Sequence, residues 1–263
     1  MAHGLHKRGY NVIASARKAD DVKKLQEEGL QCIQLDLDDS LSIDKAVKET
    51  LRLGNGKIYA LFNNAAYGQP GAVEDLSRDI LRQQFETNLF GSVELTNKIL
   101  PAMRQQGFGR IIQNSSVLGL ITLRYRGAYN ASKFAMEGLT DTLRQELDET
   151  NIRVSLILPG PIKSRFRANA FAAFQKNIDT EHSAHQEVYQ KIEQRLQKKG
   201  DAVPFTLPPE AVLEKVIHAL ESSRPKPRYY VTVPTYLFGF LRRLLSTRAL
   251  DGILLRVSRS EHR

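Results

Sequence analysis

The sequence predicts an α/β fold in which a doubly wound parallel sheet forms a single domain over residues 1–263. Short apolar runs alternate along the chain with longer segments of helical periodicity, an order typical of parallel strands joined by helices. Several of these runs are continuously apolar rather than alternating, as expected of strands covered on both faces. A chain of 263 residues can bury one large core of this kind.

Each predicted element has a local signal. The helix predicted over 40–53 follows Asp39, a residue type that caps helix N-termini. Gly9 ends the helix predicted at 2–9, and Gly29 ends the helix predicted at 20–28. The strands are predicted at residues 11–15, 31–36, 58–62, 110–114, 153–158 and 228–233. The helices are predicted at residues 2–9, 20–28, 40–53, 77–105, 127–149 and 208–222.

Two segments fall outside this alternation. Residues 165–207 are polar and weakly patterned, which favours an insertion that covers the site as a substrate lid rather than part of the core. Residues 234–263 predict two short, basic amphipathic helices. Residues 236–243 fit either a helix packed on the body, which we favour, or a helix bound at a membrane interface.

Composition narrows the functional classes. The single cysteine, Cys32, excludes an internal disulfide and leaves no cysteine cluster for a metal, so we expect no metal site. No apolar run approaches the length of a membrane span and no signal sequence follows Met1, so we expect a cytoplasmic protein.

The positive charge is concentrated at one end. Residues 223–263 hold nine Lys and Arg against two acidic residues, a net +7 out of +9 for the chain. No nucleic-acid motif or aromatic stacking platform accompanies this charge, so we expect no nucleic-acid partner. Peripheral contact with an anionic membrane surface is the alternative that the tail favours.

Tyr129 and Lys133 are the first candidate catalytic pair. Four residues apart on a helix, they lie on one face, so an ammonium can sit beside a phenol. A neighbouring cation stabilises a phenolate and makes the phenol a better acid and base near neutral pH. The spacing is common by chance and indicates little alone. Ser116 follows the strand at 110–114, at the sheet edge where open α/β sheets bind ligands.

Together these motifs resemble the short-chain dehydrogenase/reductase family. Asn63-Asn64-Ala65-Ala66 is similar to its Asn-Asn-Ala-Gly segment, and Asn88 matches its helix asparagine. Ser116 lies thirteen residues before Tyr129, with Lys133 four after it, and 159–164 resembles the family's Pro-Gly-x-x-x-Thr segment. The resemblance covers nearly the whole chain and implies a Rossmann-like fold. The C-terminal tail of the chain is similar to that of one branch of the family, the aldehyde, retinol and steroid-type carbonyl reductases.

The resemblance implies a role for each catalytic residue. Tyr129 would give a proton to a carbonyl oxygen as hydride arrives from the nicotinamide, or the reverse for an alcohol, and Ser116 would hydrogen-bond that oxygen. Lys133 would contact the nicotinamide ribose and lower the pKa of Tyr129, and Asn88 would hold a water that relays protons to Lys133. The implied substrate is a small apolar carbonyl compound or alcohol, and family members commonly pair through the helices at 77–105 and 127–149, so we expect a homo-oligomer.

The resemblance also implies a cofactor site. Arg17 and Lys18, without a carboxylate, follow the first strand and favour the 2′-phosphate of NADP over NAD. The other residues that it assigns to the cofactor are Asp36 and Leu37 at the adenine, Asn63 and Ala65 along the dinucleotide, Tyr129 and Lys133 at the ribose, and Pro159, Gly160, Ile162 and Ser164 at the carboxamide.

Departures from the family pattern leave alternatives open. Ala66 replaces a glycine, which is harmless only if its φ is negative. The family's first strand and Gly-rich phosphate loop are absent before Ala2, and we expect their absence to open the sheet between the strands near Val12 and Leu61. We favour an active reductase whose recorded start is too far downstream. The alternatives are a truncated, non-catalytic interaction module and a cofactor-sensing regulator.

Overall fold

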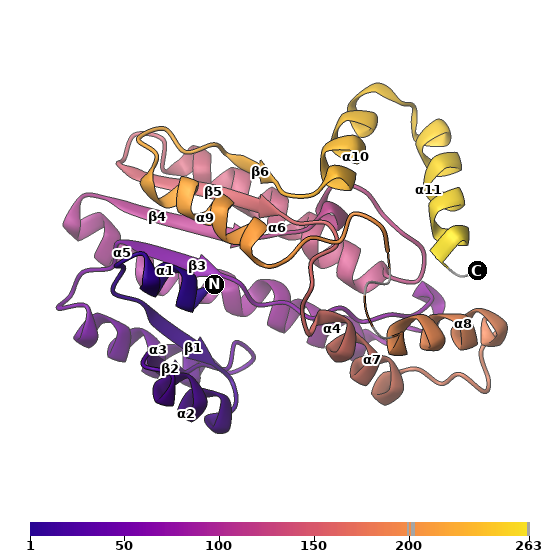
Figure 1. The fold of residues 1–263 in the computed structure, drawn as a ribbon, viewed down its shortest axis with the longest axis horizontal. Coiled ribbons are helices and arrows are strands. Elements are labelled where there is room, and N and C mark those ends of the chain that lie inside the picture. Colours follow the sequence, from indigo (N-terminus) through magenta and orange to yellow (C-terminus); the bar gives the residue numbers. More distant parts are fainter. Residues whose placement is uncertain (199, 201–202, 262–263) are drawn as a thin grey trace.

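Two parallel sheets run through the part of the chain described by the computed structural model, residues 1–198, 200 and 203–261 (Figure 1). The first pairs β1 (Ile13–Ala16) with β2 (Gln31–Gln34). The second has the order β3 (Ala60–Asn63), β4 (Gly109–Asn114), β5 (Ile152–Leu158) and β6 (Arg228–Tyr230), and every pairing is parallel. The α/β prediction is confirmed, and the sheet is open between β1 and β3, as expected, since no ladder joins these two strands in the described residues.

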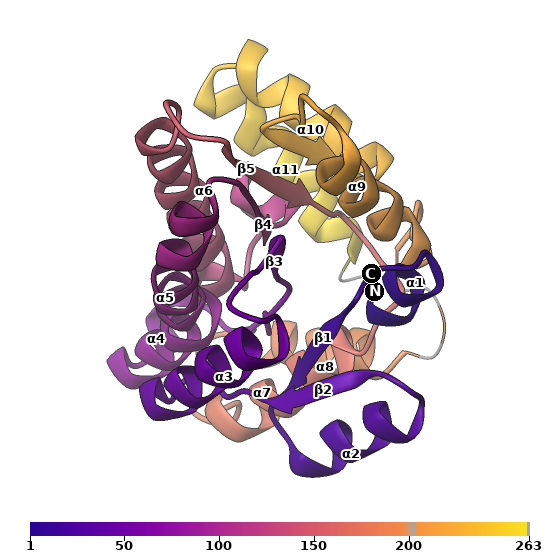
Figure 2. The same cartoon turned by 90° about the vertical axis from the view of Figure 1, so that its left-hand side faces the viewer.

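Helices cover both faces of the larger sheet (Figure 2). One face is packed by α3 (Ser40–Leu53), α5 (Gly91–Gln106) and α6 (Gly127–Glu146), in a cluster that includes the fully buried Ile43, Met103 and Ile111. The other face is covered by α1 (Ala2–Lys7) and α9 (Glu210–Glu221), around Ile112 and Val216. Neighbouring β4 residues Ile111 and Ile112 enter opposite clusters because side chains alternate along a strand.

Local signals set the element bounds closely. Helix α3 has the predicted bounds, and the Asp39 carboxylate accepts a hydrogen bond from Leu41 N at 2.9 Å, as a cap does. The helix predicted over 77–105 is three segments: α4 (Arg78–Phe85), a π-helical turn at Glu86–Phe90, and α5. The charged helix predicted at 20–28 is α2 (Ala19–Glu27), which packs on β2.

The predicted lid is more core-like than its composition indicates. It contains α7 (Phe166–Asn177) and α8 (Gln186–Gln197), while residues 199 and 201–202 of this segment lie outside the described residues. Phe174, Tyr189, Ile192 and Leu196 are buried in one cluster with Ala128 of α6. The expectation that this segment lacks core residues was therefore wrong, because Tyr189, Ile192 and Leu196 recur at helical spacing and form a stripe that its polar composition hides.

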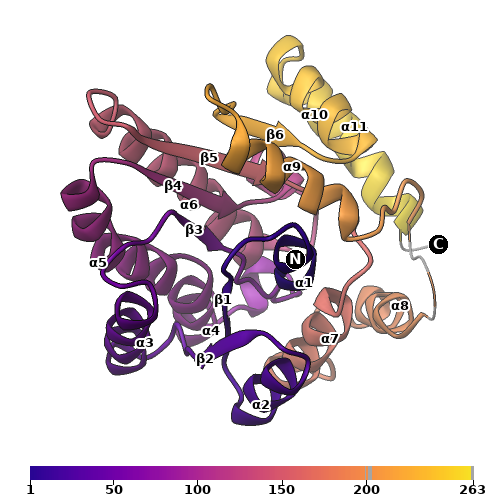
Figure 3. The ribbon, with the colours of Figure 1, turned by 60° about the vertical axis from the view of Figure 1, so that its left-hand side comes forward.

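The tail forms a helical pair at one end of the molecule (Figures 1 and 3). Helix α10 (Val233–Leu244) packs near the turn after β4, and α11 (Thr247–Glu261) returns alongside it. Residues 262–263 of the predicted tail lie outside the described residues. None of the described helices is both long and apolar enough to cross a membrane.

Candidate active site

Tyr129 and Lys133 are stacked on the first turns of α6, as their spacing predicts. Lys133 Nζ lies 5.7 Å from the centroid of the Tyr129 ring. The lysine is fully buried, and the tyrosine is 8% exposed. The phenol and the ammonium therefore share a desolvated environment at the carboxyl end of β4.

The Lys133 ammonium is held by the backbone. Its Nζ donates a hydrogen bond to the carbonyl oxygen of Asn114, the last residue of β4, at 2.7 Å. Burial lowers the pKa of Lys133 to about 7, against a smaller raising effect from the carboxylate of Glu137. The side chain thus titrates near neutral pH.

The direction of the Tyr129 pKa differs from the expectation. Burial raises the pKa of Tyr129 to about 12, and a hydrogen bond with Ser116 opposes this shift. The expected lowering by Lys133 is not what the structure shows, because the desolvation of the phenolate outweighs the favourable interactions of the phenolate form. At neutral pH the phenol holds its proton and is a donor.

Ser116 has two roles. It is buried at the end of β4, where its Oγ accepts a hydrogen bond from Leu118 N at 3.1 Å and caps the short helix Val117–Gly119. Its hydroxyl also interacts with the Tyr129 phenol and opposes the rise in the pKa of that phenol. The cap fixes the hydroxyl position next to the phenol, so the local and the catalytic interpretations of this serine are compatible.

Asn88 lies in the π-helical turn and is fully buried. Its Oδ1 accepts from Tyr67 N at 3.1 Å, and its Nδ2 donates to Tyr67 O at 3.0 Å and to Ser132 Oγ at 3.1 Å. Ser132 Oγ in turn donates to the carbonyl oxygen of Tyr129 at 2.9 Å. The amide therefore joins the loop after β3 to the helix that carries Tyr129, while a water relay to Lys133 stays a prediction. Isolated π turns of this kind often mark functional sites.

Sequence reasoning missed two residues here. Gln84 of α4 is fully buried, accepts from Gln69 N at 2.8 Å and donates to Tyr67 O at 2.9 Å, so it holds the same loop as Asn88. Phe166, the first residue of α7, packs edge-on against the Tyr129 ring with centroids 5.3 Å apart. Neither contact has a local sequence signal, since each joins segments far apart in the chain.

The loop after β3 lies close to the catalytic helices and carries two residues predicted to contact the cofactor, Asn63 and Ala65. The side chain of Asn63 is buried, and its Nδ2 donates to Thr96 Oγ1 of α5 at 2.9 Å, so the amide ties the end of β3 to that helix, while its contact with a cofactor stays a prediction. Ala65 is partly exposed beyond the strand end, as a cofactor contact requires. Ala66 is not among the residues with positive φ, so its replacement of glycine is harmless.

The predicted adenine segment follows β2. Asp36 makes a turn, because its N donates to Ser42 Oγ at 2.9 Å and its Oδ1 accepts from Asp38 N at 3.1 Å. Leu37 packs on the cluster of α3 and α5, and a Cβ at Gly91 would lie 2.1 Å from Leu37 O. Gly91 therefore lets this loop reach the helix, a requirement that the sequence motifs do not indicate.

Arg17 is exposed just after β1, and its carbonyl oxygen accepts from Gln34 Nε2 at 3.0 Å. Burial raises the pKa of Tyr67 to about 12, the Asp38 charge adds to the rise, and the Arg17 charge opposes it. Arg17 thus lies on the same side as the loop after β3. The Asp38 carboxylate near this loop is engaged, since its Oδ1 accepts from Thr87 Oγ1 at 2.7 Å.

The segment 159–164 runs beside the end of β4. Pro159 O accepts from Val117 N at 2.8 Å, which ties this segment to the residue after Ser116. A Cβ at Gly160 would lie 2.1 Å from Thr232 Oγ1, so only glycine fits there. Ile162 forms a bridge with Leu207, and the Ser164 hydroxyl accepts from Phe166 N at 3.3 Å.

The assembled residues fit the nicotinamide end of a dinucleotide. An ammonium has three donors, and Lys133 gives one to Asn114 O and a weak one to Met136 Sδ at 4.0 Å, so it retains a donor for a ribose hydroxyl. Ser116, Tyr129, Lys133 and the 159–164 segment meet at the carboxyl ends of β4 and β5, where open α/β sheets bind ligands. Arg17, Asp36 and Leu37 stand apart from them, on the loops after β1 and β2.

Comparison with known proteins shows the family of the chain. Residues 1–175 match the family described as short chain dehydrogenase. The chain is 42% identical over 250 residues to the uncharacterized oxidoreductase YbbO of Escherichia coli (strain K12), covering 95% of this chain and 87% of that protein. It is 34% identical to the NADPH-dependent 3-dehydrocapnine reductase of Ornithobacterium rhinotracheale, covering 94% and 88%.

Solved structures show the same fold. A short-chain dehydrogenase from Streptomyces avermitilis superposes with a TM-score of 0.76 at 27% identity, covering 98% of this chain and 92% of that one. Structures of this fold have been solved with NADP and with NAD. The α/β, Rossmann-like prediction is thus confirmed, and the chain belongs to the short-chain dehydrogenase family of oxidoreductases.

Proposed function

We propose that the protein transfers hydride between NADP and an apolar aldehyde, ketone or alcohol, with Tyr129 as the proton donor and acceptor. The observation that carries this proposal is the contact of the Tyr129 phenol with the Ser116 hydroxyl, with the Lys133 ammonium on the same buried helix face. This arrangement puts two O–H groups where one carbonyl oxygen can meet both.

Reduced nicotinamide supplies the hydride when it is bound in this site. As the hydride adds to the carbonyl carbon, the electron pair of the C=O bond moves to the oxygen. Tyr129 donates its proton to that oxygen, and Ser116 stabilises the developing charge by hydrogen bonding. With a pKa of about 12, the Tyr129 phenol is protonated at neutral pH, which is the form that donates a proton in carbonyl reduction.

Lys133 tunes this step. Its ammonium supports the tyrosinate that forms when the proton leaves, and its remaining donor holds the ribose. Asn88 acts at a distance from the reacting atoms, because it fixes the loop after β3 and the first turns of α6 through Tyr67 and Ser132. We assign it a positioning role.

NADP is favoured by the cations after β1. A guanidinium binds a phosphate through paired, charge-assisted hydrogen bonds, and Arg17 has an exposed side chain at this position. The Ornithobacterium relative is named as NADPH-dependent, which supports the same choice.

An apolar substrate is favoured by the surroundings of Tyr129. Leu118, Ile121, Phe238 and Leu254 form one cluster with it, drawn from the turn after β4 and from both tail helices. Helix α7 adds Phe166 on another side, in keeping with residues 165–207 as a lid. A polar substrate would lose hydration here without gaining partners.

The test is the consumption of NADPH by the purified chain with a series of medium-chain aldehydes and aromatic ketones, beside hydrophilic aldehydes and with NADH in parallel. We expect turnover of the apolar carbonyl compounds with NADPH and a lower rate with NADH. Binding of NADPH without turnover of any carbonyl compound would instead indicate a cofactor-sensing protein.

A further inference from the structure

Helix α10 leaves one apolar face uncovered. Val233, Tyr236, Leu237, Phe240 and Leu244 are 58%, 54%, 50%, 61% and 64% exposed. Their spacing of three and four residues places them on one side of the helix. The opposite side, which carries Thr235 and Gly239, is buried, so the helix is anchored to the body by one face only.

The exposed face is large for a surface helix. Single exposed apolar residues are ordinary, whereas five on one face form a patch of the kind that marks an interaction site. Aromatic and aliphatic side chains alternate along it, as they do on helices that lie at the boundary of lipid headgroups and acyl chains. Since no described helix can span a membrane, such contact would be lateral.

Positive charge accompanies this face. Arg242 and Arg243 are in the last turn of α10, and α11 adds three exposed arginines: Arg248, Arg256 and Arg259. Within the described part of 234–261 the acidic residues are Asp251 and Glu261. Two copies that met through this face would bring like charges together, whereas an anionic surface complements them.

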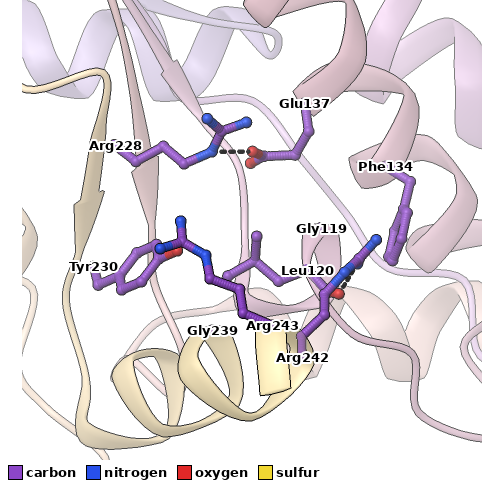
Figure 4. A pocket seen from close by; sticks show the side chains of 9 residues that line it. All are labelled: Gly119, Leu120, Phe134, Glu137, Arg228, Tyr230, Gly239, Arg242 and Arg243. Atoms are coloured by element: carbon purple, nitrogen blue, oxygen red, sulfur yellow. Dashed lines mark hydrogen bonds and ion pairs between the residues drawn. The ribbon is translucent and has the colours of Figure 1, made fainter. Parts of the chain in front are cut away.

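A pocket beneath α10 can receive an anionic group. It has a volume of about 360 Å³ and lies between α10, α6 and β6, with Arg228, Arg242 and Arg243 among its lining residues (Figure 4). Arg228 is neutralised by Glu137, at 3.0 Å, and by Asp141. Arg242 donates to Leu120 O and lies over the Phe134 ring.

Arg243 differs from the other two arginines. In the part of the chain that the structure describes, no carboxylate is paired with Arg243. The pocket therefore keeps an uncompensated guanidinium next to the apolar face, and a guanidinium suits a phosphate geometrically.

We propose that α10 docks on the surface of an anionic phospholipid bilayer, its apolar face at the acyl boundary and the pocket at Arg243 holding a headgroup phosphate. The pair of helices α10 and α11 also forms one side of the candidate active site, since Phe238, Leu250 and Leu254 pack in the cluster around Tyr129. Docking would place that site beside the bilayer.

The experiment is co-sedimentation of the purified chain with sucrose-loaded vesicles of phosphatidylcholine alone and of phosphatidylcholine mixed with phosphatidylglycerol. We expect binding to the mixed vesicles, at least tenfold weaker binding to phosphatidylcholine alone, and release by high salt. The double variant Leu237→Ser/Phe240→Ser should bind the mixed vesicles at least tenfold more weakly, and so should Arg243→Glu/Arg248→Glu.

Matched controls test whether vesicle binding depends on this surface or on any exposed apolar or basic residues. Leu41→Ser/Phe205→Ser removes a leucine and a phenylalanine that are 68% and 59% exposed elsewhere, and Arg78→Glu/Arg104→Glu makes the same charge change on α4 and α5. Both controls should bind as the wild type does. Circular dichroism and thermal unfolding confirm that all variants fold.

Three results would overturn the proposal. The first is that folded wild-type protein does not bind the mixed vesicles. The second is that the Leu237/Phe240 variant binds them as its control does, while glycerol phosphate displaces the protein, which would indicate a site for a soluble phosphate. The third is a dimer in light scattering that this variant dissociates without any vesicle binding, which would make the face an interface between copies.

Discussion

Phe166 lies edge-on against Tyr129, with ring centroids 5.3 Å apart and ring planes 65° apart. The lid thus places an aromatic ring against the candidate proton donor. Gly68 makes room for it, since a Cβ there would lie 2.8 Å from Phe166 Cζ. Phe166 is 37% exposed, so it borders both the phenol and the solvent.

Phe166→Ala should change substrate selection. The truncation opens space beside Tyr129, so we expect kcat/KM to rise several-fold for bulky aromatic ketones relative to short aldehydes. The ratio is measured with paired substrates under identical conditions. Phe205→Ala, which removes another exposed phenylalanine after α8, should leave the ratio unchanged. An unaltered ratio in Phe166→Ala would show that this ring does not border the substrate.

Lys133 should impose a pH dependence on stability. Its pKa is about 7 when folded and about 10.4 when unfolded, so the unfolded chain binds more protons between these values. The cost of burying the charge is therefore largest below pH 7 and is relieved as the pH rises toward 10. Between pH 7 and 9 the wild type should gain about 2 kcal/mol relative to Lys133→Met.

Urea unfolding of wild type and Lys133→Met at pH 7, 8 and 9 measures this difference, because groups that do not interact with Lys133 titrate alike in the two proteins. The quantity compared is the slope of the free energy of unfolding against pH, and the absolute free energies of the two proteins are not compared. Parallel pH profiles would show that the lysine is not desolvated as the structure indicates.

Asn88→Ala should destabilise the protein and disturb the site together. It leaves the backbone N–H and C=O of Tyr67 short of partners, although Gln84 still reaches that C=O. We expect a loss of roughly 2–4 kcal/mol in the free energy of unfolding, from unmet buried polar groups. Ser92→Ala is the matched control, since Ser92 is buried and its hydroxyl has no partner within the described residues. Equal stability of the two variants would contradict this role.

Arg17→Glu should shift cofactor preference. The change replaces a candidate partner of the 2′-phosphate with a carboxylate that repels it and can accept from ribose hydroxyls. We expect the ratio of kcat/KM for NADPH to that for NADH to fall at least tenfold, equivalent to about 1.4 kcal/mol. Lys24→Glu on α2 makes the same charge change in a helix and should leave the ratio near its wild-type value. A ratio equally unaffected in both variants would remove Arg17 from the cofactor site.

Local sequence signals were sufficient wherever neighbouring residues decide the structure. The Asp39 cap and the apolar spacing set α3, and the Tyr129–Lys133 spacing set the stacking on α6. The pKa direction of Tyr129 could not be predicted, because it depends on burial by segments distant in sequence. The same holds for the contact of Phe166 with Tyr129.

Composition gave a wrong expectation for one segment, and at one residue the motif left a contact undescribed. The stripe of Tyr189, Ile192 and Leu196 was present in the sequence, but the polar average of 165–207 concealed it. Asn63 matches the family motif, and the structure adds a hydrogen bond from its Nδ2 to Thr96 of α5 that the motif does not indicate, while its place at the cofactor stays a prediction. A motif indicates which residue is present and leaves the direction of its side chain to the fold.

The most direct test of the proposed chemistry is the rate of NADPH oxidation by Tyr129→Phe with an aldehyde that the wild type reduces, measured together with the affinity for NADPH. The change removes one hydroxyl and keeps the ring against Phe166. We predict a fall in kcat of about 10³-fold or more, because the phenol acts mainly in the transition state, while NADPH affinity stays within a few-fold. A variant that retains wild-type turnover would contradict the assignment of Tyr129 as the proton donor.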